Sequence, residues 1–185
     1  LLDSELQRFF YAVGMPMLQG YGLSEATPII SANSLGKGRH RFGSSGKVIQ
    51  PLELKILDSD GNELPLGEKG EIVIRVGEKK PIGLFKEYFR DNELTASVWH
   101  DGLYHTGDVA WRDEDGYYWF VSRKDDVIKS SGYRIGPFEV ESALMKHPAV
   151  LECAITGVPD ETRGMVVKAT IVLNEAWKGK EGDAL

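Results

Sequence analysis

Alternating apolar and polar residues in the middle of the chain predict strands that bury one face. Residues 52–57 and 71–76 follow this pattern, and the turn-forming residues 58–62 come directly after the first of them. Helical content is low in this region, apart from a short helical turn around residues 92–98. We therefore expect residues 43–122 to form a small, antiparallel, barrel-like subdomain.

A second turn sequence, Asp113 to Gly116, joins two further apolar and aromatic runs, 109–111 and 117–121. Its Asp-Glu-Asp-Gly sequence is typical of the connection in a β-hairpin. The hairpin carries four aromatic side chains, which we assign to the hydrophobic core rather than to a ligand cage. These are Trp111, Tyr117, Trp119 and Phe120.

The first residues of the chain show the apolar spacing of a helix. Ser4 to Gln7 has the spacing of a capping box, and Gly14 and Pro16 are expected to end the helix. Residues 17–20 then predict a short buried strand, whose C-terminal end would present the next residues to a ligand. The apolar helix positions are Leu6, Phe9, Phe10 and Val13.

The pattern changes again after residue 123. Two short apolar runs, 127–129 and 133–135, flank a Ser-Ser-Gly sequence, which predicts a hairpin or a tight loop. Pro137 suits the first position of a helix, and His147 followed by proline would end that helix.

Two strands, at about residues 150–156 and 165–173, follow this helix, and residues 176–185 are expected to form a loop. The predicted fold class is therefore mixed α+β. It comprises the end of a layered α/β domain, a small antiparallel barrel-like subdomain, and a small, mobile α+β C-terminal domain. The expected boundaries are 1–42, 43–122, a hinge at 123–126, and 127–185.

Composition and charge narrow the function classes. The chain has 185 residues, 42% hydrophobic and 27% charged, which are ordinary values for a globular protein. A formal net charge of −6 argues against nucleic acid or an anionic membrane as the main partner. No apolar run reaches the length of a transmembrane helix. The single Cys153 excludes an internal disulfide and fits a reducing compartment, so we expect a cytoplasmic protein.

Tyr21 to Glu25 (Tyr-Gly-Leu-Ser-Glu) combines groups that suit a nucleotide. The tyrosine ring offers a stacking face, while the hydroxyl of Ser24 and the carboxylate of Glu25 suit phosphate and Mg²⁺. Taken alone, the pentapeptide is equally typical of a glycine-containing turn that leads into a helix.

Tyr104 to Asp108 (Tyr-His-Thr-Gly-Asp) is the second candidate segment. A Gly-Asp pair most often closes a turn. An ionised Asp108 could instead accept hydrogen bonds from both hydroxyls of a ribose. We expect His105 to be structural.

Two further segments carry basic residues. Arg123 to Asp126 is either a solvated charge cluster or a hinge, since it lies where the pattern changes from barrel-like to α+β. Ser131 to Arg134 is either a plain hairpin turn with an exposed cation or a ligand loop. Gly132 would let a ligand approach the backbone closely. The guanidinium of Arg134 could donate two hydrogen bonds to a phosphate.

In their order and their residues, these segments resemble the motifs of the adenylate-forming superfamily of acyl-CoA synthetases, luciferases and peptide-synthetase adenylation domains. The likeness is greatest to the medium-chain acyl-CoA synthetases, and it rests on Ser130 to Glu141 (Ser-Ser-Gly-Tyr-Arg-Ile-Gly-Pro-Phe-Glu-Val-Glu). It covers residues 19–173. Two family features, a Gly/Ser/Thr-rich phosphate loop and a late catalytic lysine, are not found in the sequence. We therefore assign no catalytic residue and expect the chain alone to be nearly inactive.

The resemblance implies a nucleotide site and a metal ligand. Glu25 is the implied Mg²⁺ ligand, and Asp108 the implied acceptor for the ribose hydroxyls. The residues implied to bind ATP or AMP are Gln19, Gly20, Tyr21, Gly22, Leu23, Ser24, Asp108 and Arg123.

The resemblance also implies a hinge and a CoA site. Asp125 is the implied hinge between a large and a small domain. Arg163 on its own would be an ordinary loop cation, and it joins the CoA set only by its place in the family pattern. The residues implied to bind CoA or substrate are Ser131, Gly132, Tyr133, Arg134 and Arg163.

The implied function is part of an ATP-dependent acyl-CoA synthetase. Such an enzyme joins a small carboxylic acid to ATP with Mg²⁺ and then transfers the acyl group to CoA. Two alternatives stay open: an adenylation domain that loads a carrier-protein thiol, and a non-catalytic module that binds a nucleotide or CoA.

Overall fold

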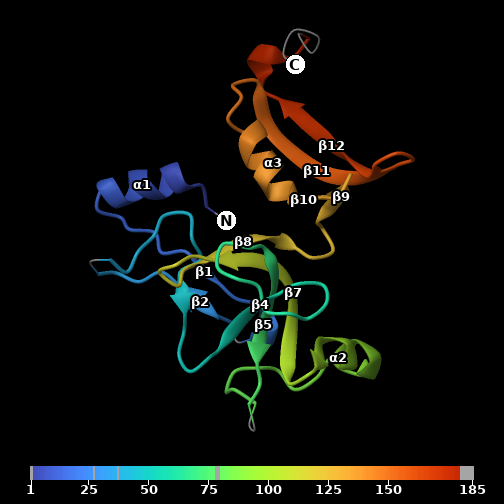
Figure 1. The fold of residues 1–185 in the computed structure, drawn as a ribbon. Helices are drawn as coiled ribbons and strands as arrows, with labels where there is room; N and C mark the ends of the chain where they lie inside the picture. The colour runs from blue at the N-terminus through green and yellow to red at the C-terminus, as the bar shows by residue number, and fades with distance from the viewer. Residues whose placement is uncertain (1, 27, 37, 78–79, 180–185) are drawn as a thin grey trace. The chain divides into compact units, whose positions relative to one another are not determined.

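The chain forms two compact units, Leu1–Phe120 and Val121–Leu185, which are described separately (Figure 1). Within the part of the chain that the structure describes, every helix is too short or too polar to cross a membrane. The computed structural model describes residues 2–26, 28–36, 38–77 and 80–179.

A curled, antiparallel sheet organises the first unit (Figure 1). Its strands follow the order β4-β5-β7-β6, and β8 pairs with β7. This sheet confirms the predicted barrel-like arrangement, and α2 (Asn92–Val98) confirms the predicted helical turn. The strands are β4 (Leu54–Leu57), β5 (Gly70–Arg75), β6 (Trp99–His100), β7 (Leu103–Arg112) and β8 (Tyr118–Arg123).

The central strand β5 is buried on both faces. It pairs with β4 along one edge and with β7 along the other. Successive strand residues point to opposite faces, yet Ile72, Val73 and Ile74 are each at most 1% exposed. The predicted strand at residues 71–76 is confirmed, but the prediction that it is half-buried is wrong, because the unit covers both faces of its central strand.

A second, smaller sheet contains the strands β1 (Gly20–Tyr21), β2 (Ser31–Ala32) and β3 (Lys47–Val48), all antiparallel. The prediction of a buried strand at residues 17–20 is wrong. Met17 is 43% exposed, and β1 begins only at Gly20. The β1–β2 pairing joins Gly20 to Ala32 and Tyr21 to Ser31. It therefore does not extend back to Met17.

α1 (Ser4–Ala12) confirms the predicted N-terminal helix, but its cap and its buried face differ from the prediction. The Asp3 carboxylate accepts hydrogen bonds from the backbone N–H groups of Glu5 and Leu6, at 2.9 and 3.2 Å. The N-cap is therefore Asp3 rather than the first residue of the predicted capping box. Gln7 is the buried residue of the helix, and its amide donates to a backbone carbonyl at 2.9 Å.

The second unit is a four-stranded antiparallel sheet with one helix, α3 (Pro137–Leu144). The sheet order is β10-β9-β12-β11, and the Glu141 carboxylate of α3 accepts from the backbone N–H of Ile155 on β11 at 2.9 Å. The predicted hairpin, helix and two strands are confirmed. A 3₁₀ turn, Glu175–Trp177, follows, and residues 180–185 of the predicted loop lie outside the described residues. The strands are β9 (Ile128–Ser130), β10 (Tyr133–Ile135), β11 (Val150–Asp160) and β12 (Gly164–Leu173).

Asp113 holds the turn between β7 and β8. Its carboxylate accepts from the indole N–H of Trp119 at 3.0 Å and from the backbone N–H of Tyr117 at 2.9 Å, and it pairs with Arg41 at 2.5 Å. Burial alone would raise the pKa of Asp113, but these hydrogen bonds lower it below its usual range. An ionised carboxylate therefore organises the turn.

We expect Asp113→Ala to lower the free energy of unfolding at neutral pH by about 2 kcal/mol, because four donors, including the backbone N–H of Asp115, lose a charged acceptor. The pKa of this carboxyl is lower in the folded state, so its stabilisation is present above the unfolded value and lost as the pH falls through the folded value. The difference between variant and parent, measured by urea unfolding, should shrink below about pH 4. Glu114→Ala, an exposed change in the same turn, is the control; an equal loss in both variants would contradict the assignment.

Candidate functional site

One face of β7 carries the first of the predicted ligand residues. β7 buries every second side chain, so that Tyr104, Thr106 and Asp108 lie on the same face. The Thr106 hydroxyl donates to the backbone carbonyl of Ile72 at 2.7 Å and accepts from the backbone N–H of Asp108 at 3.1 Å. Asp108 is only 6% exposed, and the strand fixes its direction.

Tyr21 reaches this face from β1. Its hydroxyl donates to Oδ2 of Asp108 at 2.6 Å, across 87 positions of sequence. Its ring is 8% exposed and stacks on Phe120, with the ring centroids 5.8 Å apart. The ring thus belongs to the hydrophobic core, and Phe120 covers one of its faces. Burial, reinforced by the Asp108 carboxylate, raises the pKa of Tyr21 above its ordinary value, so the phenol keeps its proton.

Gly22 is required by a close approach of two backbone segments. A β-carbon at this position would lie 1.6 Å from the carbonyl oxygen of Pro28 and 2.8 Å from the α-carbon of Ile29. The backbone N–H of Ile30 donates to the carbonyl of Tyr21 at 2.8 Å, which holds the two segments together. Any larger residue would push the Tyr21–Glu25 segment away from β2.

The neighbours of Gly22 in the predicted nucleotide set have different environments. Gln19 is half-buried, and its carbonyl accepts from the backbone N–H of Asn33 at 2.9 Å. Gly20 forms part of β1. Leu23 packs against the hydrophobic core, whereas Ser24 is exposed at the start of a 3₁₀ turn. The segment thus offers its backbone and the Ser24 hydroxyl to a ligand more readily than the Leu23 side chain.

Glu25 lies in that 3₁₀ turn, Ser24–Ala26, with a half-buried side chain. Its Oε1 accepts from the hydroxyl of Tyr88 at 3.0 Å, and its backbone carbonyl accepts from the N–H of Phe85 at 2.7 Å. Sequence reasoning missed Tyr88. No local spacing could have revealed it, because 63 positions separate the two residues.

In the second unit, the structure brings parts of the predicted CoA set together. Ser131 and Gly132 both have positive φ, 48° and 86°, as the two-residue loop of a type I′ hairpin requires. The backbone N–H of Ser131 donates to the carbonyl of Arg163 at 3.0 Å. Tyr133 is 74% exposed and Arg134 is also exposed. Arg163 therefore lies beside the hairpin, although 32 positions of sequence separate it from Ser131.

Arg123 and Asp125 form an exposed ion pair within the second unit, at 3.5 Å. Both side chains are more than half exposed. Such a pair stabilises a fold by little, so the segment is not locked by this contact.

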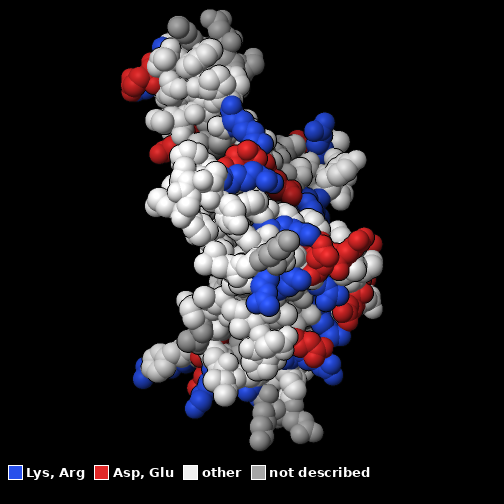
Figure 2. All heavy atoms as spheres, turned by 90° about the vertical axis from the view of Figure 1, so that its left-hand side faces the viewer, with Lys and Arg blue, Asp and Glu red and all other residues white. Residues whose placement is uncertain are grey.

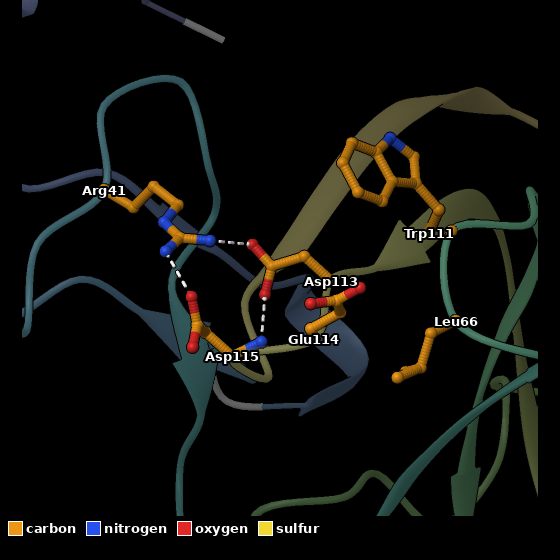
Figure 3. A pocket seen from close by; sticks show the side chains of 7 residues that line it. Arg41, Leu66, Trp111, Asp113, Glu114 and Asp115 are labelled. Atoms are coloured by element: carbon orange, nitrogen blue, oxygen red, sulfur yellow. Dashed lines mark hydrogen bonds and ion pairs between the residues drawn. The ribbon is translucent and has the colours of Figure 1, made fainter.

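The cavity in Figure 3, of about 320 Å³, contains none of the predicted site residues. Arg41, which pairs with Asp113 and Asp115, lines one side of it, and Trp111 and Leu66 lie on the opposite side. On the face shown in Figure 2, acidic and basic side chains are intermingled. Neither feature adds a residue to the candidate site.

Two family models match the chain: that of the AMP-binding enzymes over residues 2–89, and that of the AMP-binding enzyme C-terminal domain over residues 139–183. Mouse mitochondrial acyl-coenzyme A synthetase ACSM3 is 47% identical over 172 residues, and human mitochondrial ACSM5 is 46% identical over 179. These alignments cover 93% and 97% of this chain, but 29% and 31% of the relatives' own lengths. The chain belongs to the AMP-binding, adenylate-forming enzymes.

Solved structures agree with this family. The o-succinylbenzoate CoA synthetase of Bacillus subtilis, in complex with its acyl-adenylate intermediate, matches with a TM-score of 0.85 and 31% identity. That match covers 97% of this chain and 36% of the synthetase. The anthranilate CoA ligase AuaEII, in complex with anthranoyl-AMP, matches with a TM-score of 0.79 and 34% identity, over 99% of this chain and 36% of the ligase.

We expect Gly22→Ala to destabilise the first unit by about 1–3 kcal/mol, because the new methyl group cannot fit against the Pro28 carbonyl without moving backbone. Thermal unfolding measures the loss. Gly77→Ala is the matched control, since a β-carbon at that position meets nothing within 4 Å. Equal melting temperatures for the two variants would contradict the proposed close approach.

We expect Tyr21 and Tyr104 to resist ionisation in the folded chain, because burial raises the pKa of both hydroxyls above the ordinary value. The unfolded state would release these protons first, so stability should fall as the pH rises above about 10. Alkaline titration of phenolate absorbance checks this against the denatured chain, in which all seven tyrosines should titrate together. A folded chain whose seven tyrosines ionise in one step would refute the prediction.

Proposed function

We propose that this chain supplies part of the nucleotide site and part of the CoA site of an ATP-dependent acyl-CoA synthetase. The reaction joins a small carboxylic acid to ATP, giving acyl-AMP and pyrophosphate, and then moves the acyl group to the CoA thiol with release of AMP. The observation that carries the proposal is the convergence of Tyr21 and Asp108, 87 positions apart, on one hydrogen bond. The relatives named as acyl-CoA synthetases support the choice of reaction.

Asp108 would accept the ribose hydroxyls. An ionised carboxylate has about four acceptor sites on its two oxygens, and the hydrogen bond from Tyr21 uses one of them. The fixed direction of Asp108 on β7 lowers the entropy that must be lost when the ribose binds. Tyr21 would contribute to the nucleotide site by orienting the carboxylate through its hydroxyl.

Glu25 would hold Mg²⁺. Its half-buried carboxylate is an oxygen donor of the kind that Mg²⁺ takes, one or two at a time, beside phosphates and water. When bound, the ion supplies charge neutralisation on the phosphates. The protein's own part is to fix the direction of the carboxylate.

Adenylation needs no general base, because the substrate carboxylate is already the nucleophile. The groups present here would therefore act by position and charge. Ser24 and the backbone of the Tyr21–Glu25 segment would line the nucleotide. We also propose Arg123 as a nucleotide contact, on the family resemblance alone. Roles in positioning and charge are consistent with our assignment of no catalytic side chain in this chain.

In the second unit, the Ser131–Arg134 hairpin and Arg163 would bind CoA. The hairpin exposes Arg134, and the backbone bond between Ser131 and Arg163 keeps the Arg163 loop beside it. We propose Asp125 as the hinge, since its exposed pairing with Arg123 costs little to break.

We propose a compartment that keeps thiols reduced. The single Cys153 fits the cytoplasm, which the sequence predicts, but the mammalian relatives are named as mitochondrial.

The test is calorimetric titration of the chain with CoA, and separately with ATP and Mg²⁺. We expect Arg134→Ala to weaken CoA binding about tenfold, the size of one lost charge-assisted contact to phosphate. Lys168→Ala, which removes an exposed cation from β12 in the same unit, should leave it unchanged. We expect Asp108→Ala to weaken ATP binding without affecting CoA.

Equal losses from Arg134→Ala and Lys168→Ala would point to a nonspecific charge effect and contradict the CoA site. ATP binding that survives Asp108→Ala unchanged would contradict the ribose assignment. Binding of one ligand without the other would favour a nucleotide or CoA module over a synthetase.

A further inference from the structure

We propose that Tyr88 positions Glu25 for the metal–nucleotide complex; this inference rests on the proposed function. The Tyr88 hydroxyl donates to Oε1 of Glu25 at 3.0 Å, and nothing in the local sequence relates the two residues. A donor on Oε1 restricts rotation of the carboxylate, and we assign Oε2 to the incoming cation. Tyr88 is thus a positioning residue that acts through Glu25.

The backbone around Tyr88 is anchored to the same turn. The Phe85 N–H donates to the carbonyl of Glu25 at 2.7 Å, and the Tyr88 N–H donates to the hydroxyl of Thr95 at 3.0 Å. The segment therefore holds Glu25 both by its backbone and by its side chain. Two such contacts restrict the turn more than either does alone.

Aromatic packing fixes the ring that carries this hydroxyl. The ring of Phe85 lies 4.7 Å from that of Tyr88, 5.7 Å from Trp99 and 5.5 Å from Tyr104, measured between centroids. Pairs at these distances prefer tilted or edge-to-face geometry, which limits ring rotation. The hydroxyl of Tyr88 is consequently directed by a packed cluster rather than by a mobile loop.

Tyr104 connects this cluster to Asp108. It is 1% exposed, lies on the same face of β7 as Asp108, and packs its ring edge-on against Phe85 of the cluster. Burial, followed by the nearby Tyr88 and Glu25, raises the pKa of Tyr104 and keeps it a neutral donor. The predicted ribose acceptor and the predicted metal ligand are therefore held by one framework.

The chemistry of a phenol suits this task. An arginine or lysine at the same place would pair with Glu25 and offset the negative charge that attracts the metal. A neutral hydroxyl fixes the direction of the carboxylate and leaves that charge in place. Outer-shell donors of this kind commonly change metal affinity by about 10–100-fold when removed.

The test compares ATP binding in the presence of Mg²⁺ with ATP binding in the presence of a chelator, in the full chain. We expect Tyr88→Phe to reduce the Mg²⁺-dependent gain in ATP affinity about tenfold. ATP affinity in the chelator should stay the same, because phenylalanine keeps the packing on Phe85. Tyr11→Phe, the same chemical change at a residue 52% exposed on α1, is the matched control and should change neither value.

A double-mutant cycle separates positioning from simple packing. If Tyr88 acts through Glu25, then Tyr88→Phe should have no further effect on the Mg²⁺-dependent gain in a Glu25→Gln background. Hydrogen exchange at the Phe85 amide, which bonds the Glu25 backbone, should be as slow in Tyr88→Phe as in the parent. A loss of ATP affinity with and without Mg²⁺, together with faster exchange, would overturn positioning in favour of a structural role.

The remaining outcomes distinguish the two proposals. If the parent shows a Mg²⁺-dependent gain that Tyr88→Phe retains in full, the positioning role is overturned and the proposed function stands. If ATP binding by the parent gains nothing from Mg²⁺, both the metal role of Glu25 and its positioning by Tyr88 are overturned.

Discussion

The burial of the Asp108 carboxylate is the constraint on which the first unit depends. An ionised group at 6% exposure costs several kcal/mol unless donors surround it. The Tyr21 hydroxyl at 2.6 Å meets part of this requirement, so β1 must bring Tyr21 to the buried face of β7. Phe120 on β8 must then cover the tyrosine ring. One buried charge therefore ties together segments that lie far apart in the sequence and belong to two different sheets.

The close backbone approach at Gly22 follows from the same constraint. Tyr21 can reach Asp108 only if its strand lies tightly against the next segment, and the Ile30 N–H bonds the Tyr21 carbonyl at 2.8 Å. That contact leaves no room for a side chain at the following position, where a β-carbon would overlap the Pro28 carbonyl. The glycine of the Tyr-Gly-Leu-Ser-Glu segment is thus explained by packing within the protein, before any ligand is considered.

The sequence predicted what local spacing determines and missed what depends on distant contacts. Alternation located β4 and β5, and turn residues located the β7–β8 hairpin, because these signals lie within a few positions. The same reasoning extended a buried strand back to Met17, where no cross-strand partner supports it. Resemblance selected Tyr21 and Asp108 separately, but not the bond between them. Tyr88 had no signal at all, since its partner lies 63 positions away.

The carboxylate that holds a turn and the two predicted ligand carboxylates accept hydrogen bonds from different kinds of donor. Asp113, which holds a turn, pairs with the Arg41 guanidinium at 2.5 Å, so its charge is largely offset within the protein. Asp108 and Glu25 each accept from a tyrosine hydroxyl, which fixes direction without adding a positive charge. A carboxylate that must attract a metal ion or receive a ribose diol needs its charge and its remaining lone pairs. The Tyr21 and Tyr88 hydroxyls fix the direction of a carboxylate without offsetting its charge, whereas the Arg41 guanidinium offsets the charge of the carboxylate that holds the turn.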